Sequence, residues 1–351
     1  MSNKIAVYTI TKNEEKFIER WAESAKEADY RVIIDTGSTD KTVQKAKKAG
    51  CIVHQISVVP WRFDDARNAS LALLPSDADY CIALDADEIL CEGWRKAVDA
   101  LDPAIYNRAR YQYIWNFNPD GTPGVTFISD KIHARNGYRW KYPVHERITP
   151  SSGVVENFCD IDMRIEHHAD NSKSRGQYLN LLELAAKEDP ADDRIAHYYA
   201  RELYFYKMYF DAADEFKRHL ALPTAQWKAE RARSMRYLSE CLPAERLEWL
   251  LKAVAEDPDR RENWYALAKY WHSVHAWEDC FAAVQHALKI EDKKLDYMTE
   301  PEAWSWAIYD TAAIACYYVN LKDAAKFYGQ KALDLNPNDE RLKANMQWYE
   351  S

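Results

Sequence analysis

Two aspartates separated by one residue end a run of apolar side chains in the first hundred residues. The run Tyr80–Leu84 is followed directly by Asp85, Ala86 and Asp87. Where a strand ends, two carboxylates in this spacing can turn toward one ligand, and a hard divalent cation that bridges phosphates takes such oxygen ligands. A solvated acidic turn is the alternative for an isolated pair, but the apolar strand before it favours a cation site.

A second candidate site follows an earlier run, Arg31–Asp35. Asp35 ends this run, and Gly37 with the small hydroxyl residues Ser38 and Thr39 leads into a helical segment. An aspartate and small polar groups at this point suit the base or ribose of a nucleotide, and a capped turn without a ligand is the alternative. The single glycine forms neither a GxxxxGK[ST] phosphate loop nor a GxGxxG fingerprint.

An alternation of strands and helices is expected to position these residues. The predicted strands are continuous apolar or β-branched runs, and the helical segments between them cover residues 14–28, 39–50 and 65–74. The runs are Ile5–Ile10, Arg31–Asp35, Cys51–Ile56 and Tyr80–Leu84. Such an order predicts a parallel, Rossmann-like sheet whose ligands bind beyond the carboxyl ends of the strands. Residues 106–148 are aromatic-rich and strand-like, and are expected to extend the sheet on the acceptor side.

The remaining chain, residues 177–351, is predicted to be wholly helical and repetitive. Small residues recur at Ala200, Ser234 and Ala268, 34 positions apart, and a fourth unit at Ala313 implies an insertion near 291–303. Two equal steps of 34 indicate tetratricopeptide repeats, in which small residues allow paired helices to touch, whereas a generic helical bundle is the alternative. The predicted organisation is therefore an α/β domain over 1–176 followed by an all-α repeat domain over 177–351.

Composition narrows the class of protein. The net charge is −9, which disfavours nucleic acid as a partner. No stretch approaches the ~18–20 apolar residues of a membrane span, and the first residues lack the apolar core of a signal peptide. Seven cysteines occur without a CxxC pair, so neither a zinc ribbon nor a disulfide framework is indicated. We expect a soluble, cytoplasmic protein.

Four segments in order resemble the motifs of family 2 glycosyltransferases with the GT-A fold. They are Thr9-Ile10-Thr11-Lys12-Asn13-Glu14, Asp35-Thr36-Gly37-Ser38-Thr39-Asp40, Ala66-Arg67-Asn68 and Asp85-Ala86-Asp87. The later segments Trp140–Glu146 and Arg164–His168 resemble a bacterial and phage subgroup in which tetratricopeptide repeats follow this domain. Bacteriocin S-glycosyltransferases are relatives of that subgroup.

The resemblance implies roles for individual residues. The nucleotide would be contacted by Thr9, Glu14 and Asp35, of which Asp35 would face the base. The resemblance places Arg67 near the diphosphate, and Asp85 and Asp87 at the ribose and at a Mn²⁺ or Mg²⁺ ion. His167 is the preferred imidazole ligand of that metal, with the adjacent His168 as the alternative.

Enzymes of this family invert the anomeric centre, so one general base is needed on the acceptor side. Glu146 is the first candidate and Asp130 the second. The alternative role for Glu146 is an ordinary ion pair with Arg139 or Arg147.

The leading hypothesis is an inverting, metal-dependent enzyme that moves a hexose from a UDP-sugar to an acceptor. A polypeptide acceptor is favoured because repeat surfaces commonly bind peptides, while a glycan or modified DNA is the alternative. The second hypothesis is a non-catalytic repeat adaptor with a nucleotide-binding domain. A nucleotidyltransferase is disfavoured, because the first strand is not followed by a glycine-rich basic loop. Self-association through the repeats is also expected.

Overall fold

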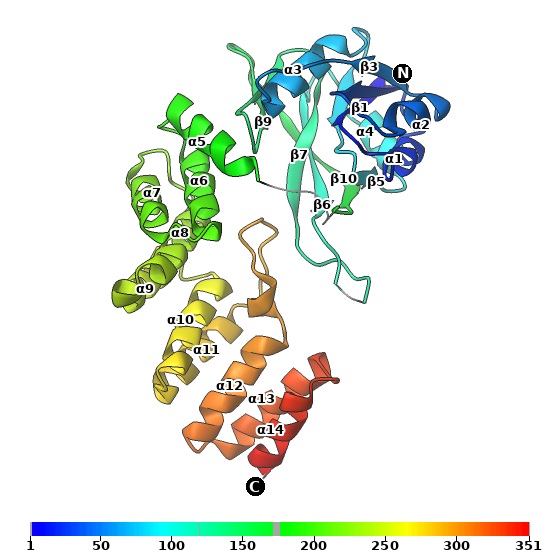
Figure 1. Cartoon of the computed structure of the whole chain (residues 1–351). Coiled ribbons are helices and arrows are strands. Elements are labelled where there is room, and N and C mark those ends of the chain that lie inside the picture. Colours follow the sequence, from blue (N-terminus) through cyan, green and yellow to red (C-terminus); the bar gives the residue numbers. More distant parts are fainter. Residues whose placement is uncertain (1, 119, 171–175, 351) are drawn as a thin grey trace. The chain divides into compact units, whose positions relative to one another are not determined.

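The computed structural model describes residues 2–118, 120–170 and 176–350, and Figure 1 shows an α/β part followed by a helical part. Two compact units divide the chain: Met1–Ala185 with Leu295–Tyr297, and Ala186–Lys294 with Met298–Ser351. The predicted order of an α/β fold followed by an all-α repeat fold is confirmed. The boundary after residue 176 stays a prediction, since compactness alone does not define a unit that folds by itself.

In the described residues, eight strands form one mixed sheet in the order β3-β2-β1-β4-β7-β6-β10-β5. The first four in this order are parallel, β7 runs antiparallel to both of its neighbours, and β5 is antiparallel to β10. The strands are β1 Ile5–Thr11, β2 Tyr30–Asp35, β3 Ile52–Gln55, β4 Tyr80–Ala83, β5 Glu88–Leu90, β6 Arg108–Ile114, β7 Thr126–Ala134 and β10 Phe158–His167. The four predicted strands are therefore all present.

Alternating side chains give this sheet two buried faces, as the continuous apolar runs require. On one face, Ile5, Val7 and Ile33 pack under α1 (Ile18–Ser24), α2 (Thr42–Lys48) and α4 (Trp94–Asp99). On the other face, Ala6 and Tyr8 pack under α3 (Phe63–Leu73) and a small hairpin of β8 (Tyr138–Lys141) and β9 (Arg147–Pro150). Two covered faces leave the strand ends as the open edge of the sheet.

The second unit repeats a pair of helices, coloured green to red in Figure 1. The small residues Ala200, Ser234, Ala268 and Ala313 all lie in the first helix of a pair and are fully buried. The helix α5 (Tyr178–Glu188) crosses the boundary between the two units. The helices after it are α6 Asp193–Phe205, α7 Tyr209–Ala221, α8 Lys228–Cys241, α9 Arg246–Glu256, α10 Arg261–Ser273, α11 Trp277–Lys289, α12 Trp306–Tyr318, α13 Lys322–Leu335 and α14 Glu340–Glu350, with short 3₁₀ turns at Pro243–Glu245 and Pro301–Trp304. The predicted insertion corresponds to the segment between α11 and α12.

Within the described ranges, none of the helices has both the length and the apolar character needed to cross a bilayer.

Two buried tryptophans allow a test of how the core supports the loop after β4. The indole of Trp21 donates to the carbonyl of Leu84 at 3.0 Å, and that of Trp94 donates to Ser24 at 3.1 Å. Either Trp→Phe change leaves a buried carbonyl without its donor and should lower the free energy of unfolding by about 1–3 kcal/mol in urea titrations. Only Trp21→Phe should also speed amide hydrogen exchange at residues 85–87; equal exchange in both variants would contradict this link.

Candidate active site

The carboxyl ends of β1, β2 and β4 bring the first predicted residues together. Thr11 lies beside Asp35 in the sheet register. The Asp35 side chain is fully buried and accepts hydrogen bonds from the backbone amides of Gly37 (3.2 Å) and Ser38 (3.1 Å). Asp35 therefore shapes the loop that follows it, which is a positioning role, and its contact with a nucleotide base stays a prediction.

The loop after β1 is tied to the loop after β2. Asn13 has a positive φ of 59°, donates through its backbone to the Ser38 hydroxyl at 2.8 Å, and accepts from the Thr39 amide at 2.8 Å. The Glu14 amide donates to the Thr42 hydroxyl at 2.7 Å. Thr9 is fully buried and Glu14 nearly so. The two predicted nucleotide loops are thus held together by hydrogen bonds.

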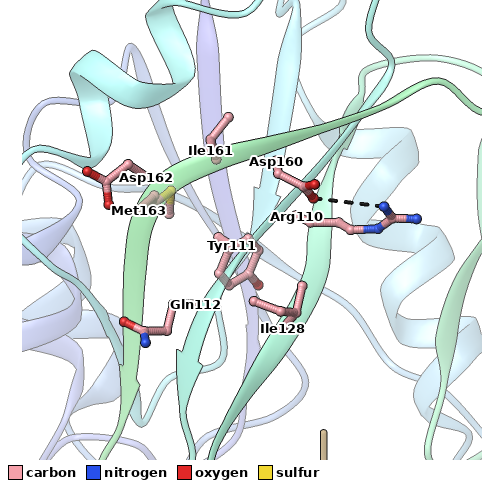
Figure 2. A pocket seen from close by; sticks show the side chains of 8 residues that line it. All are labelled: Arg110, Tyr111, Gln112, Ile128, Asp160, Ile161, Asp162 and Met163. Carbon is pink, nitrogen blue, oxygen red and sulfur yellow. Dashed lines mark ion pairs between the residues drawn. The ribbon is translucent and has the colours of Figure 1, made fainter. Parts of the chain in front are cut away.

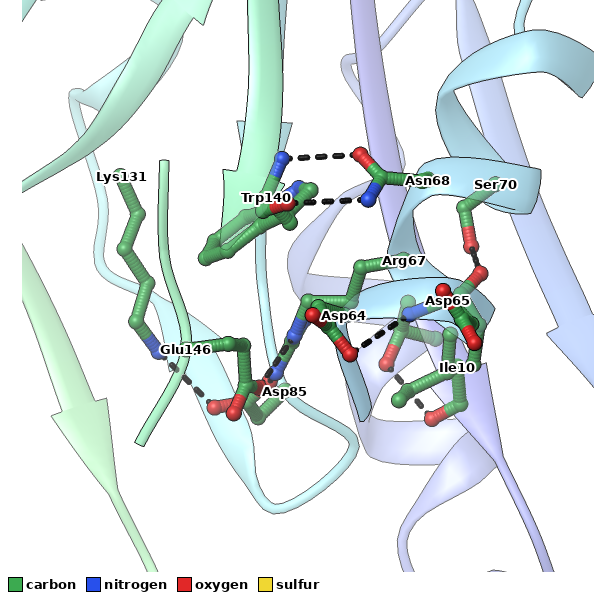
Figure 3. A network of polar contacts seen from close by, with 12 residues as sticks. Ile10, Asp64, Asp65, Arg67, Asn68, Ser70, Asp85, Lys131, Trp140 and Glu146 are labelled. Carbon is green, nitrogen blue, oxygen red and sulfur yellow. Dashed lines mark hydrogen bonds and ion pairs between the residues drawn. The ribbon is translucent and has the colours of Figure 1, made fainter. Parts of the chain in front are cut away.

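A buried arginine joins three segments that lie far apart in the sequence (Figure 3). Arg67, on α3, donates from Nε to Glu146 at 2.5 Å and from Nη2 to Asp85 at 2.6 Å. Its guanidinium lies 4.8 Å from the ring centre of Trp140. Burial alone disfavours the charged form, but Asp85 and Glu146 outweigh it and raise the pKa of Arg67. Among the described residues, its buried Nη1 has no hydrogen-bond partner.

Asp85 is shared between two cations. Its second oxygen accepts from Lys131 Nζ at 2.8 Å, and Lys131 also lies 3.2 Å from Glu88. Burial by itself raises the pKa of Asp85, yet Arg67 and Lys131 hold it well below its usual range. Asp85 is therefore ionised at neutral pH, and its side chain is held in one orientation.

Sequence reasoning missed two members of this group, Glu88 and Lys131. Glu88 is buried, accepts from the Asp85 amide at 2.8 Å and from the Tyr113 hydroxyl at 2.6 Å, and burial raises its pKa. Its position three residues after Asp85 was an available signal. No sequence signal pointed to Lys131, because this residue reaches the site only through the pairing of β7 with β4.

The last predicted metal ligands meet at the end of β10. His167 Nε2 lies 3.4 Å from Asp87 Oδ2, and its Nδ1 donates to the carbonyl of Trp115 at 2.9 Å. Burial lowers the pKa of His167, but the contact with Asp87 raises it above its ordinary value on balance. The Trp115 carbonyl fixes the ring so that Nε2 faces the carboxylate, which is the arrangement that metal-binding histidines adopt.

The adjacent His168 is directed differently. Its Nε2 lies 3.4 Å from Glu166, and its ring stacks on Phe117 with centres 5.2 Å apart. Only its backbone amide reaches Asp87, donating to the carbonyl at 2.8 Å. Of the two histidines, His167 is thus the one whose side chain shares space with Asp87.

The two base candidates are separated. Glu146 is paired with Arg67, which also binds Asp85, and its side chain is 11% exposed. Asp130 is 53% exposed and pairs with Arg108 at 2.9 Å. Arg108 in turn binds Glu156 at 2.7 Å, so the ion pair of Asp130 belongs to a different group of charged residues from that of Asp85. The structure brings Glu146, and not Asp130, to the other predicted residues.

Asn68, beside Arg67, holds the segment that carries Trp140. Its side chain accepts from the Trp140 amide at 2.8 Å and donates to the Trp140 carbonyl at 2.9 Å. The Trp140 indole donates to the Tyr8 hydroxyl (3.0 Å), which donates to His133 Nε2 (3.1 Å). Burial lowers the pKa of His133 to about 3, so this ring is neutral and can accept. The network fixes the aromatic face under Arg67.

A pocket of about 540 Å³ lies elsewhere on the sheet (Figure 2). The pairing of β10 with β6 is interrupted between Asp160 and Arg164, and the strands separate there. Tyr111 and Met163 line the opening, and Asp160 lies 3.8 Å from Arg110 at its rim. None of its lining residues is a predicted site residue, so its size alone does not mark the active site.

Comparison with known proteins identifies the first part of the chain. Residues 6–155 match the family Glycosyl transferase family 2. An uncharacterized glycosyltransferase of Rickettsia bellii is 34% identical over 112 residues, which are 32% of this chain and 36% of that protein. The lipopolysaccharide core biosynthesis glycosyltransferase LpsC of Rhizobium meliloti is 28% identical over 160 residues, 43% of this chain and 58% of that protein.

The chain thus spans about a third of the length of the Rickettsia protein it matches. Among solved structures, YrrB, a TPR protein with an unusual peptide-binding site, is 14% identical with a TM-score of 0.37 over 49% of this chain and 83% of YrrB. Residues 6–155 thus match glycosyltransferase family 2, and helix pairs with the 34-residue spacing of tetratricopeptide repeats follow them.

Proposed function

We propose that this protein transfers a hexose from a UDP-sugar to an acceptor, with inversion at the anomeric carbon and with a divalent metal ion. The observation that carries the proposal is the convergence of Arg67, Asp85 and Glu146 at one edge of the sheet, beside Asp87 and His167. These residues come from four separate segments, and the family match supports the same chemistry.

Asp87 and His167 would hold the metal. Their facing atoms are 3.4 Å apart, a separation that two ligands of one cation can adopt with small movements. Mn²⁺ or Mg²⁺ bound there would neutralise charge on the departing nucleoside diphosphate. The His167 ring is already oriented by its hydrogen bond to Trp115. The site therefore fits the ion without rearranging the sheet.

Arg67 is proposed to bind the diphosphate. Two of its three nitrogens are held by Asp85 and Glu146, so the guanidinium cannot swing away. The third, Nη1, is buried and, within the described residues, still has an N–H to donate. A phosphate oxygen is the strongest acceptor for such a group.

Glu146 is proposed as the general base. The acceptor hydroxyl or thiol gives its proton to the carboxylate, its oxygen or sulfur attacks the anomeric carbon, and the bond from that carbon to the diphosphate breaks. The ion pair with Arg67 holds the carboxylate in place. The exposed ring of Trp115, stacked on His167 at 4.5 Å, offers a flat apolar face for a sugar.

A polypeptide acceptor bearing acidic groups is proposed from a pocket in the repeats. The pocket has a volume of about 220 Å³, and its charged lining residues are four basic ones, Arg233, Arg236, Arg246 and Lys269, and two acidic ones, Glu240 and Glu300. Arg236 donates to Glu300 at 2.7 Å. Its Nε and Nη2 atoms are buried and have no hydrogen-bond partner among the described residues. This geometry suits a further carboxylate.

Arg236→Gln should lower transfer to the polypeptide acceptor by about tenfold or more, because a buried charged hydrogen bond contributes about 1.5–3 kcal/mol. Release of UDP from the donor in the absence of acceptor should not change. The measurement is the yield of glycosylated product in a lysate. The control is Lys252→Gln, because Lys252 is exposed and forms an ion pair with the exposed Glu248. Equal yields for both variants would remove this pocket from acceptor binding.

The acceptor itself is identified by mass spectrometry after incubation of the full chain with a panel of nucleotide sugars and a cell lysate. A hexose on a polypeptide supports the proposal. A hexose on lipopolysaccharide would move the acceptor to the class that the name of the Rhizobium relative indicates.

A further inference from the structure

We propose a second metal site, within the first repeats, that binds a divalent transition ion, Zn²⁺ by its ligand types, between Asp193, His219 and Glu230. The ligand atoms of these three side chains all lie within 4.8 Å of one another. They come from the first turn of α6, the last turn of α7 and the first turn of α8. One imidazole nitrogen with two carboxylates is a donor set that zinc takes in proteins.

The centre of this site is His219, which is fully buried. Its Nε2 lies 3.3 Å from Glu230 Oε1, yet this contact lacks hydrogen-bond geometry, and within the described residues Nε2 has no hydrogen-bond partner. Ligands of a tetrahedral ion with bonds of about 2.0–2.1 Å are about 3.3 Å apart. The His219–Glu230 separation thus matches two ligands of one ion better than a donor and its acceptor.

A second layer of hydrogen bonds orients the imidazole. His219 Nδ1 lies 3.0 Å from the Ser234 hydroxyl, which lies 2.8 Å from His197 Nδ1. In the tautomer in which His219 Nδ1 donates to this hydroxyl, the lone pair of His219 faces the cluster from Nε2. Metal-bound histidines are commonly oriented in this way.

An ion in this position would tie together three helices of consecutive pairs. Asp193 directly follows Asp192, whose side chain accepts from the Ile195 amide at 2.8 Å and caps α6. Asp193 is therefore held at the helix end, with its carboxylate in the cluster with His219 and Glu230. The ion would stabilise the start of the repeat array, since binding to the folded state alone raises stability.

The test uses the full chain, freed of metal by chelator and titrated with Zn²⁺ by calorimetry, with thermal unfolding followed in parallel. Asp193→Asn should weaken binding to this site by at least about tenfold and remove the zinc-dependent rise in the unfolding midpoint of the repeats. Asp192→Asn is the matched control, because asparagine caps a helix as well as aspartate does and leaves all three ligands in place. It should bind zinc like the wild type.

His219→Gln is the second variant, and far-ultraviolet circular dichroism without metal checks that it folds. Asp87→Ala distinguishes this site from the proposed active site. The variant should lose the cation of the active site but still bind the cation that depends on Asp193. If wild type, Asp193→Asn and Asp192→Asn bind zinc with the same affinity and unfold at the same temperature, the cluster is a metal-free polar network.

Discussion

Asp87→Ala is expected to lower kcat for sugar transfer by about 10³-fold or more, because an ion that stabilises a departing diphosphate contributes several kcal/mol. Asp87 lies beside His167, so the variant removes one of two facing ligands. Its side chain is 21% exposed, so the thermal unfolding midpoint should stay within a few degrees of the wild type. The measurement is kcat with saturating Mn²⁺.

The matched control is Asp160→Ala, which removes an exposed carboxylate of the same sheet that lies 3.8 Å from Arg110. It should transfer sugar at the wild-type rate. An Asp87→Ala protein that remains active in chelator would overturn the metal assignment.

Glu146→Gln is expected to lower kcat by about 10²–10⁴-fold with a hydroxyl acceptor, the usual contribution of a general base. Glutamine keeps an oxygen that can accept from Arg67, so the guanidinium should stay in place and the donor KM should change little. This split between kcat and KM separates a base from a residue that only positions Arg67. A thiol acceptor, partly ionised near neutral pH, should show a smaller loss.

Asp130→Asn is the companion variant. Because Asp130 is half-exposed and pairs with Arg108, its loss should leave kcat within about twofold of the wild type, as for most surface substitutions. If instead Glu146→Gln turns over normally and Asp130→Asn is inactive, the base is Asp130.

The sheet could be predicted because its signal is local. Buried parallel strands are continuous apolar runs, and each of the four predicted strands ends within a residue or two of its observed end. Helix ends were less accurate. The segment 14–28 contains only the seven residues of α1, because residues 15–17 and 25–27 form turns on either side of it. The Glu14 carbonyl accepts from Phe17 and Ile18 in the first of these turns. Turns and helices share the same polar residues, so the pattern does not separate them.

The site was predictable only in part, for a related reason. Asp85 and Arg67 could be found because strand ends of a parallel sheet meet at one edge. The ion-pair partner of Glu146 could not be predicted. The sequence suggested Arg139 or Arg147, whereas the structure pairs Glu146 with Arg67, 79 positions away. Pairings of this kind, like that of Lys131 with Asp85, depend on which strands become neighbours, and side-chain patterns along one strand do not carry that information.

The central claim is that this domain is an active, metal-dependent transferase and not a nucleotide-binding adaptor. The most direct measurement is release of UDP from a panel of UDP-hexoses by the full-length wild type, with Mn²⁺ and then with chelator. We predict slow, Mn²⁺-dependent hydrolysis of at least one donor, which chelator stops. Tight UDP binding without turnover of any donor, with or without metal and with acceptor-containing lysate present, would contradict the claim and favour the adaptor.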